Sequence, residues 1–157
     1  MKLRHVLLAI LVVFSISCSK ESLETEEILT AQNVTSMEAE LLQLVNRHRD
    51  AQGQKTLSFS EVAYKYANSH TDYMVKKGAL THDNFGARVS GISKEENAKA
   101  VSENVAMGYL SSEMTLEAWL SSESHRKTME GNFSHTAISV KKDSEGTLYF
   151  TQLFYLK

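Results

Sequence analysis

The stretch VSENVAM at residues 101–107 alternates between apolar and polar side chains, as a half-buried β-strand does. Val101, Val105 and Met107 fall on one face of such a strand. Glu103 falls on the same face, although burying an ionised carboxylate requires hydrogen bonds or a partner cation. Glu103 is therefore either paired in the folded protein, or the phase of the strand is misassigned.

A β-hairpin is expected at the end of the chain. Residues 136–142 and 147–156 both alternate with period two, and they flank the turn-forming residues 143–146. Before the hairpin, residues 115–122 have the apolar spacing of a helix and contain Trp119. We expect Trp119, the only tryptophan in the chain, to lie in the hydrophobic core.

Two longer helices are expected upstream of the strand. Thr35 and Glu38 have the spacing of a capping box, which marks the start of the first helix. Ser58 and Glu61 repeat this spacing at the start of the second helix, and Gly78 is its natural end.

Residues 85–89 predict a short helix, and a charged loop follows it. The resulting order is helices, one strand, a helix and two strands. This order predicts an α+β fold in which helices pack against a small antiparallel sheet. His48 and His70 lie on the apolar stripes of the two long helices, and we expect each to be a buried ring that makes one hydrogen bond.

The composition describes an ordinary globular protein. The chain has 157 residues, of which 42% are hydrophobic and 23% are charged, and this length accommodates one domain. A net charge of −2 provides no clustered positive field for phosphates, so no nucleic-acid partner is expected. The single cysteine excludes an intramolecular disulfide.

Residues 1–17 are predicted to be a targeting signal. Lys2 and Arg4 precede an apolar run over residues 6–16, which is shorter than the roughly twenty residues that cross a bilayer. The run ends beside Cys18, and this arrangement resembles a bacterial lipoprotein signal, in which the cysteine becomes a lipid-bearing N-terminus. A plain signal peptide with a chance cysteine is the alternative.

The lipoprotein interpretation divides the chain into three parts. Residues 1–17 are removed, residues 18–35 form a lipidated cysteine and a polar tether, and residues 36–157 form the domain. The membrane partner is then the bacterial cell envelope, reached through the lipid on Cys18. Ser15 departs from this pattern, because such signals usually have leucine there.

Several short motifs follow one another in an order that is more specific than any of them alone. They are Asn46 to Arg49, Leu57, Thr81-His82-Asp83 with Phe85 and Arg88, Glu103-Asn104-Val105-Ala106, Trp119 with Ser122, His125 and Arg126, and Thr151-Gln152 with Phe154. In this order they resemble the CAP domain of cysteine-rich secretory proteins, antigen five and pathogenesis-related proteins. The resemblance is to the compact bacterial branch, which lacks disulfides.

The resemblance implies an α-β-α sandwich with a cleft lined by two histidines and two acids. The matching histidines are His82 and His125, and the first acid is Glu103. The position of the second acid is Ser122, so this chain lacks one carboxylate of the tetrad. Glu103 should point into the cleft between the two histidines.

This set of residues allows more than one chemistry. Two histidines and a glutamate are ligands that zinc accepts, with a fourth position left open. Alternatively, His82, Glu103 and His125 could activate a water molecule without a metal. They could also form only a buried polar network. The chain contains no H-E-x-x-H motif and no G-x-S-x-G motif. Ser122 and His125 are three residues apart and would share a helical face, but nothing designates Ser122 as a nucleophile.

Three functions remain open at this point. The favoured one is an envelope-anchored binding module for a small molecule, lipid, peptide or cell-wall fragment, with a possible divalent metal. The second is a hydrolase that uses zinc or a histidine-activated water. The third is a structural or partner-binding protein in which the tetrad only joins the sheet to the helices.

Overall fold

The computed structural model describes residues 31–157; the predicted signal and Cys18 lie outside these residues. The helices are α1 (Thr35–Ala51), α2 (Glu61–Lys77), α3 (Phe85–Glu96), α4 (Ser112–Ser121) and α5 (Glu123–Met129). The strands are β1 (Ser58–Phe59), β2 (Ala100–Met107), β3 (His135–Lys142) and β4 (Leu148–Leu156).

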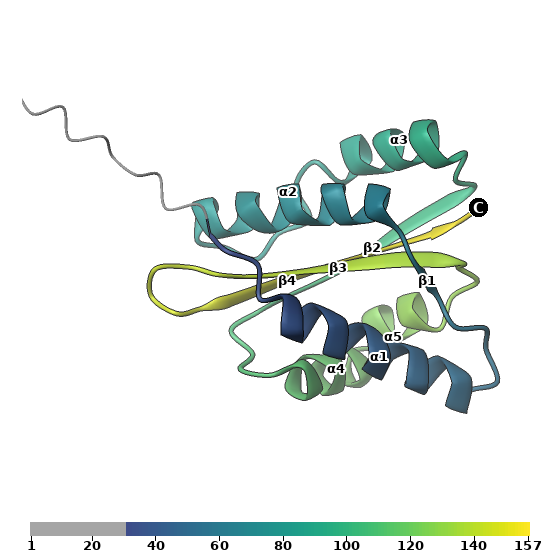
Figure 1. Ribbon diagram of the computed structural model, residues 1–157, viewed down its shortest axis with the longest axis horizontal. Helices are drawn as coiled ribbons and strands as arrows, with labels where there is room; N and C mark the ends of the chain where they lie inside the picture. The colour runs from purple at the N-terminus through teal and green to yellow at the C-terminus, as the bar shows by residue number, and fades with distance from the viewer. Residues whose placement is uncertain (1–30) are drawn as a thin grey trace, which may run out of the picture.

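The elements form three layers with the sheet in the middle. The strands lie in the order β1-β3-β4-β2, with β2 and β3 both antiparallel to β4. Helices α2 and α3 cover one face of the sheet, and α1, α4 and α5 cover the other (Figure 1). The predicted α-β-α sandwich is confirmed. The sheet is not entirely antiparallel, because the strand β1 pairs parallel to β3. With two residues, β1 is too short to produce a recognisable alternation of apolar and polar side chains.

The two capping boxes are not formed as predicted. Ser60, not Ser58, caps α2, because its Oγ accepts a hydrogen bond from Ala63 N at 3.2 Å while Ser58 belongs to β1. In α1, Thr35 is the first helical residue, and the N-cap position makes no side-chain hydrogen bond.

Glu38 holds the start of the domain to the sheet instead of capping α1. Its carboxylate accepts hydrogen bonds from Val140 N at 2.9 Å and from the Tyr64 hydroxyl at 2.8 Å. The carboxylate also accepts from Asn33 Nδ2, and Val34 N donates to Val140 O at 2.8 Å. The last residues assigned to the tether therefore contact the edge of the sheet.

Helix α3 is longer than expected. The predicted helix ended at residue 89, whereas the observed one continues to Glu96 and buries Ile92. Gly91 is needed inside it because the Tyr66 phenol crosses the helix there, and a Cβ at position 91 would overlap that ring and its hydroxyl. The charged segment after residue 89 is thus helical and not a loop.

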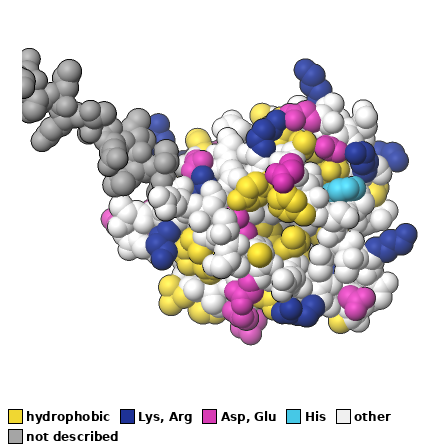
Figure 2. Space-filling model, in the orientation of Figure 1, with side chains coloured by type: hydrophobic (Ala, Val, Ile, Leu, Met, Phe, Trp, Pro, Cys, Tyr) yellow, Lys and Arg dark blue, Asp and Glu magenta, His cyan; other side chains and the backbone are white. Residues whose placement is uncertain are grey.

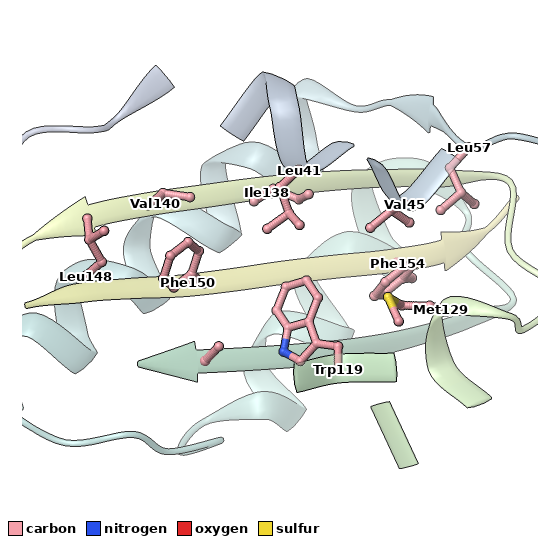
Figure 3. Packing of buried hydrophobic residues seen from close by; sticks show 11 residues of the cluster. Leu41, Val45, Leu57, Trp119, Met129, Ile138, Val140, Leu148, Phe150 and Phe154 are labelled. Atoms are coloured by element: carbon pink, nitrogen blue, oxygen red, sulfur yellow. The ribbon is translucent and has the colours of Figure 1, made fainter. Parts of the chain in front are cut away.

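The larger hydrophobic core lies between the sheet and helices α1, α4 and α5 (Figure 3). Trp119 is 1% exposed in this core, as predicted, and its Nε1 donates to Val105 O at 3.2 Å. Figure 2 shows basic and acidic side chains interspersed over the face that it draws, without an extended field of one sign.

Replacing Trp119 with alanine should destabilise the domain by about 3–5 kcal/mol, because it leaves a large cavity in the core. The measurement is urea unfolding followed by circular dichroism. Met114→Ala on the same helix is the control; that side chain is 46% exposed, and its loss should change stability by less than about 0.5 kcal/mol. Equal midpoints for the two variants would contradict the prediction.

Candidate functional site

The phase predicted for strand β2 is correct at Glu103. Val105 packs with Met74 in the layer of α2 and α3, and Glu103 lies on the same side of the strand. Asn104 points to the opposite layer, where its Nδ2 donates to His125 O at 3.1 Å. Glu103 is thus a buried carboxylate, and the question is what pairs with it.

Arg88 is the main partner of Glu103. Its Nε donates to Oε2 at 2.6 Å and its Nη2 to Oε1 at 2.8 Å, which makes a two-pronged ion pair. The Glu103 side chain is only 2% exposed and that of Arg88 7%, so water screens the pair little. The sequence marked Arg88 only as part of a motif, and an arginine fifteen residues before a buried acid gives no local signal of pairing.

The loop between α2 and α3 is fixed on both sides of His82. Arg88 Nη1 donates to Asp83 O at 2.7 Å, and Asp83 N donates to Thr81 Oγ1 at 3.1 Å. The Asp83 carboxylate accepts from Lys77 and Tyr73, and these hydrogen bonds hold its pKa well below the usual range. The backbone that presents His82 is therefore anchored to α2 and α3.

His82 has one fixed nitrogen and one open nitrogen. Its Nδ1 lies 2.8 Å from Glu103 Oε1, and because a carboxylate accepts, Nδ1 carries the proton. The side chain is 54% exposed, and among residues 31–157 nothing hydrogen-bonds to Nε2. In the neutral ring, Nε2 is then an acceptor on a largely exposed side chain.

His125 lies on α5, which packs against β2. Its Nδ1 is 2.8 Å from Ser122 Oγ, and its ring is half-buried. Burial is the main reason why the pKa of His125 is lowered, and His82 contributes in the same direction. The predicted contact with Ser122 forms, but at the junction of α4 and α5 and not on one helical face.

The expected position of Glu103 between the two histidines is only half correct. Glu103 contacts His82, but its other neighbours are Arg88 and His70, whose Nε2 lies 3.9 Å from Oε1. No hydrogen bond joins Glu103 to His125 within the described part of the chain. The polar cluster thus comprises a Glu103 group and a separate Ser122–His125 pair.

A zinc site that uses Glu103 with the two histidines does not fit this arrangement. Both Glu103 oxygens already accept from Arg88, and a metal there would have to displace a buried guanidinium. Within residues 31–157, no three side chains of His, Cys, Asp or Glu come together as a metal-binding group.

The two histidines expected to be structural differ in burial. His70 is 3% exposed, and its Nε2 donates to Thr81 O at 2.8 Å, as predicted. Burial lowers the pKa of His70, although the charge of Glu103 partly opposes this. His48 is only half-buried and bonds to Glu130 Oε1 at 2.9 Å.

Comparison with known proteins agrees with the architecture. Residues 42–154 match the model of the family described as CAP, the cysteine-rich secretory protein family. This chain belongs to the CAP family. The Bacillus subtilis protein YkwD is 31% identical over 114 residues, and the membrane protein YlbC of the same organism is 25% identical over 124 residues. The matches span 68% and 76% of this chain but only 43% and 34% of those relatives.

Solved structures share the CAP fold at low sequence identity. An outer surface protein of Borrelia burgdorferi superposes with a TM-score of 0.72 at 18% identity, covering 81% of this chain and 98% of that protein. An extracellular SCP-domain protein of Bacillus anthracis has a TM-score of 0.68 at 21% identity, covering 78% of this chain and 41% of that protein. None of the helices in the described residues is long and apolar enough to cross a membrane.

Replacing Glu103 with glutamine should destabilise the CAP domain by about 3–5 kcal/mol, because it leaves the Arg88 guanidinium buried without its counter-ion. The pKa of His70 should fall further, since the Glu103 charge raises it. Urea unfolding and an NMR titration of the histidine rings measure the two effects.

Glu95→Gln is the matched control for this substitution. The Lys65–Glu95 pair is exposed and screened by water, so its loss should change the stability very little. Similar stability losses for Glu95→Gln and Glu103→Gln would show that the buried pair has no special role.

Proposed function

We propose that this CAP domain is an extracytoplasmic binding module whose ligand contacts the imidazoles of His82 and His125. The observation that carries the proposal is the arrangement of His82. Its Nδ1 is fixed on a buried carboxylate, while the side chain is largely exposed on an anchored loop and Nε2 has no hydrogen-bond partner among residues 31–157. A preorganised acceptor of this kind binds a hydroxyl, amide or ammonium donor with little entropic cost.

The arrangement supports binding better than hydrolysis. Ser122 Oγ lies on His125 Nδ1, but no carboxylate within residues 31–157 hydrogen-bonds to the His125 ring to complete a relay. Glu103, the acid that could serve, is held by Arg88 on α3. A serine nucleophile needs a base that a third group orients, and that third group is missing from the described residues.

Glu103 itself is best described as a positioning residue. It joins β2 to α3 through Arg88 and fixes the ring of His82, without being exposed to a ligand. The Arg88–Glu103 contact thus supports one part of the structural hypothesis, namely that the polar residues join the sheet to the helices. The binding function therefore rests on His82 and His125, while Glu103 supports them.

The location that we propose is the outside of the cell membrane, with the chain anchored through lipid on Cys18. The likeness in fold to proteins called outer surface and extracellular supports export of this domain. The apolar run before Cys18 and the polar residues after it support the lipid anchor. One acyl-bearing cysteine would hold the domain close to the membrane surface.

His82→Gln should weaken ligand binding roughly tenfold, or about 1.4 kcal/mol, because it removes the imidazole Nε2 and does not place an acceptor at the same position. The melting temperature should change little, because the glutamine amide N–H can still donate to Glu103. The probes are muropeptides, phospholipid vesicles and zinc chloride, and the readout is the NMR shift of the His82 and His125 rings. Shifts confined to other parts of the domain would contradict the proposal. Ester hydrolysis that disappears in Ser122→Ala would instead support a hydrolase.

Cys18→Ala should move the protein from the membrane fraction to the soluble fraction, or leave the precursor unprocessed. The physical reason is that the anchor is a covalent lipid whose attachment requires the Cys18 thiol. Fractionation followed by electrophoresis measures both outcomes. A variant that fractionates and migrates like the wild type would rule out lipidation at this residue.

A further inference from the structure

A cleft of about 240 Å³ lies between α2 and α3, apart from the outward face of His82. Its α2 side consists of residues spaced along one helical stripe, Tyr66, Ser69, His70 and Tyr73, and its α3 side of Asn84, Ala87 and Arg88. The proposed binding site uses neither the tyrosines nor the cleft. The volume suits one six-membered ring with a substituent, since an apolar cavity of about 150 Å³ holds benzene.

The two tyrosine walls are held by equivalent contacts. The Tyr66 hydroxyl donates to Glu95 Oε1 at 2.7 Å, and the Tyr73 hydroxyl donates to Asp83 Oδ2 at 2.8 Å. Each of these carboxylates also accepts from a lysine, Glu95 from Lys65 and Asp83 from a second lysine on α2. Both rings are thus fixed before a ligand arrives, which lowers the entropic cost of binding between them.

The charges around the mouth of the cleft cancel. Lys65 is paired with Glu95, and Lys77 is paired with Asp83. At the floor, Arg88 is paired with Glu103 and donates its remaining hydrogen bonds to backbone carbonyls. A ligand that carries a net charge would therefore gain no counter-ion here, so the cleft favours a neutral molecule.

His70 lines this cleft and has one ring nitrogen without a hydrogen-bond partner among residues 31–157. The side chain is almost fully buried, and its Nε2 donates to Thr81 O, so the neutral ring carries a lone pair on Nδ1. Among residues 31–157, no donor hydrogen-bonds to Nδ1. Burial lowers the pKa of His70, which keeps this acceptor available at neutral pH.

We infer that the cleft between Tyr66 and Tyr73 binds a small neutral ring compound that donates one hydrogen bond to His70 Nδ1. The tyrosine faces contact the ring, and the buried imidazole selects for a hydroxyl or N–H substituent. The ligand class is a phenol or a similar heteroaromatic N–H compound. The site is independent of the ligand proposed for His82, although Arg88 takes part in the support of both.

Phenol and toluene test this inference because they have nearly the same shape and differ in the hydrogen-bond donor. Toluene is the more hydrophobic molecule, so a cleft without an acceptor binds it more tightly. With His70 Nδ1 as acceptor, phenol should bind roughly fivefold more tightly than toluene. The measurement is an NMR titration of the full-length chain at pH 7.5 that follows the rings of His70, Tyr66 and Tyr73.

Ala87→Phe supplies the matching variant, since residue 87 is exposed on α3 and its new side chain would fill the cleft. It should reduce phenol binding at least tenfold, while Ser90→Phe, exposed on the same helix outside the cleft, should not. His82→Gln should leave phenol binding unchanged, which separates this site from the proposed function. Toluene binding as tightly as phenol, shifts that do not reach His70, or phenol binding that survives Ala87→Phe would each overturn the inference.

Discussion

The buried ion pair between Arg88 and Glu103 is the interaction on which the site depends. Two hydrogen bonds join the guanidinium of α3 to the carboxylate of β2, in a part of the domain that water hardly reaches. Desolvating both ions is costly, and the geometry must be nearly ideal to offset that cost. The same carboxylate then fixes the His82 ring, so the position of α3 and the orientation of His82 are set by one residue.

The edge strand β2 explains how residues from opposite layers meet. Glu103 and Asn104 are adjacent, and their side chains point to opposite faces of the sheet. Glu103 holds the His82 ring on the side of α2 and α3, while Asn104 binds the His125 carbonyl on the side of α5. Within residues 31–157, β2 is an edge strand of the sheet, so both of its faces lie beside helices at the margin of the domain. The strand thereby joins two layers that the rest of the sheet keeps apart.

The sequence predicted the features that depend on local periodicity. The hairpin, the core position of Trp119 and the phase of β2 at Glu103 all follow from side-chain alternation or helical spacing, and the structure confirms them. The prediction of the capping boxes was wrong because serine or threonine and glutamate at that spacing can form hydrogen bonds with other partners. The Glu38 carboxylate, for example, accepts hydrogen bonds from Val140 N and the Tyr64 hydroxyl, which are far away in the sequence.

The partners of the site residues could not be predicted in the same way. Arg88, His70 and His82 are brought to Glu103 by the packing of α2 and α3 on the sheet, which no spacing along the chain encodes. The resemblance implied that His82 and His125 line one cleft, but it gave no sign that Glu103 turns toward Arg88. The long-range contacts, and not the residue types, decide which of the chemistries that the sequence allowed can operate.

The net charge of the polar cluster around Glu103 and His125 follows from these contacts, and it affects which ligands the cluster can bind. Glu103 carries one negative charge, and Arg88 cancels it at hydrogen-bond distance. Ser122 occupies the position where the family pattern has a second acid, so the His125 side of the cluster contributes no carboxylate. Among the described residues, a cation would therefore meet no uncompensated carboxylate beside the two imidazoles. Such a surface selects a ligand by the direction of its hydrogen-bond donors rather than by its charge.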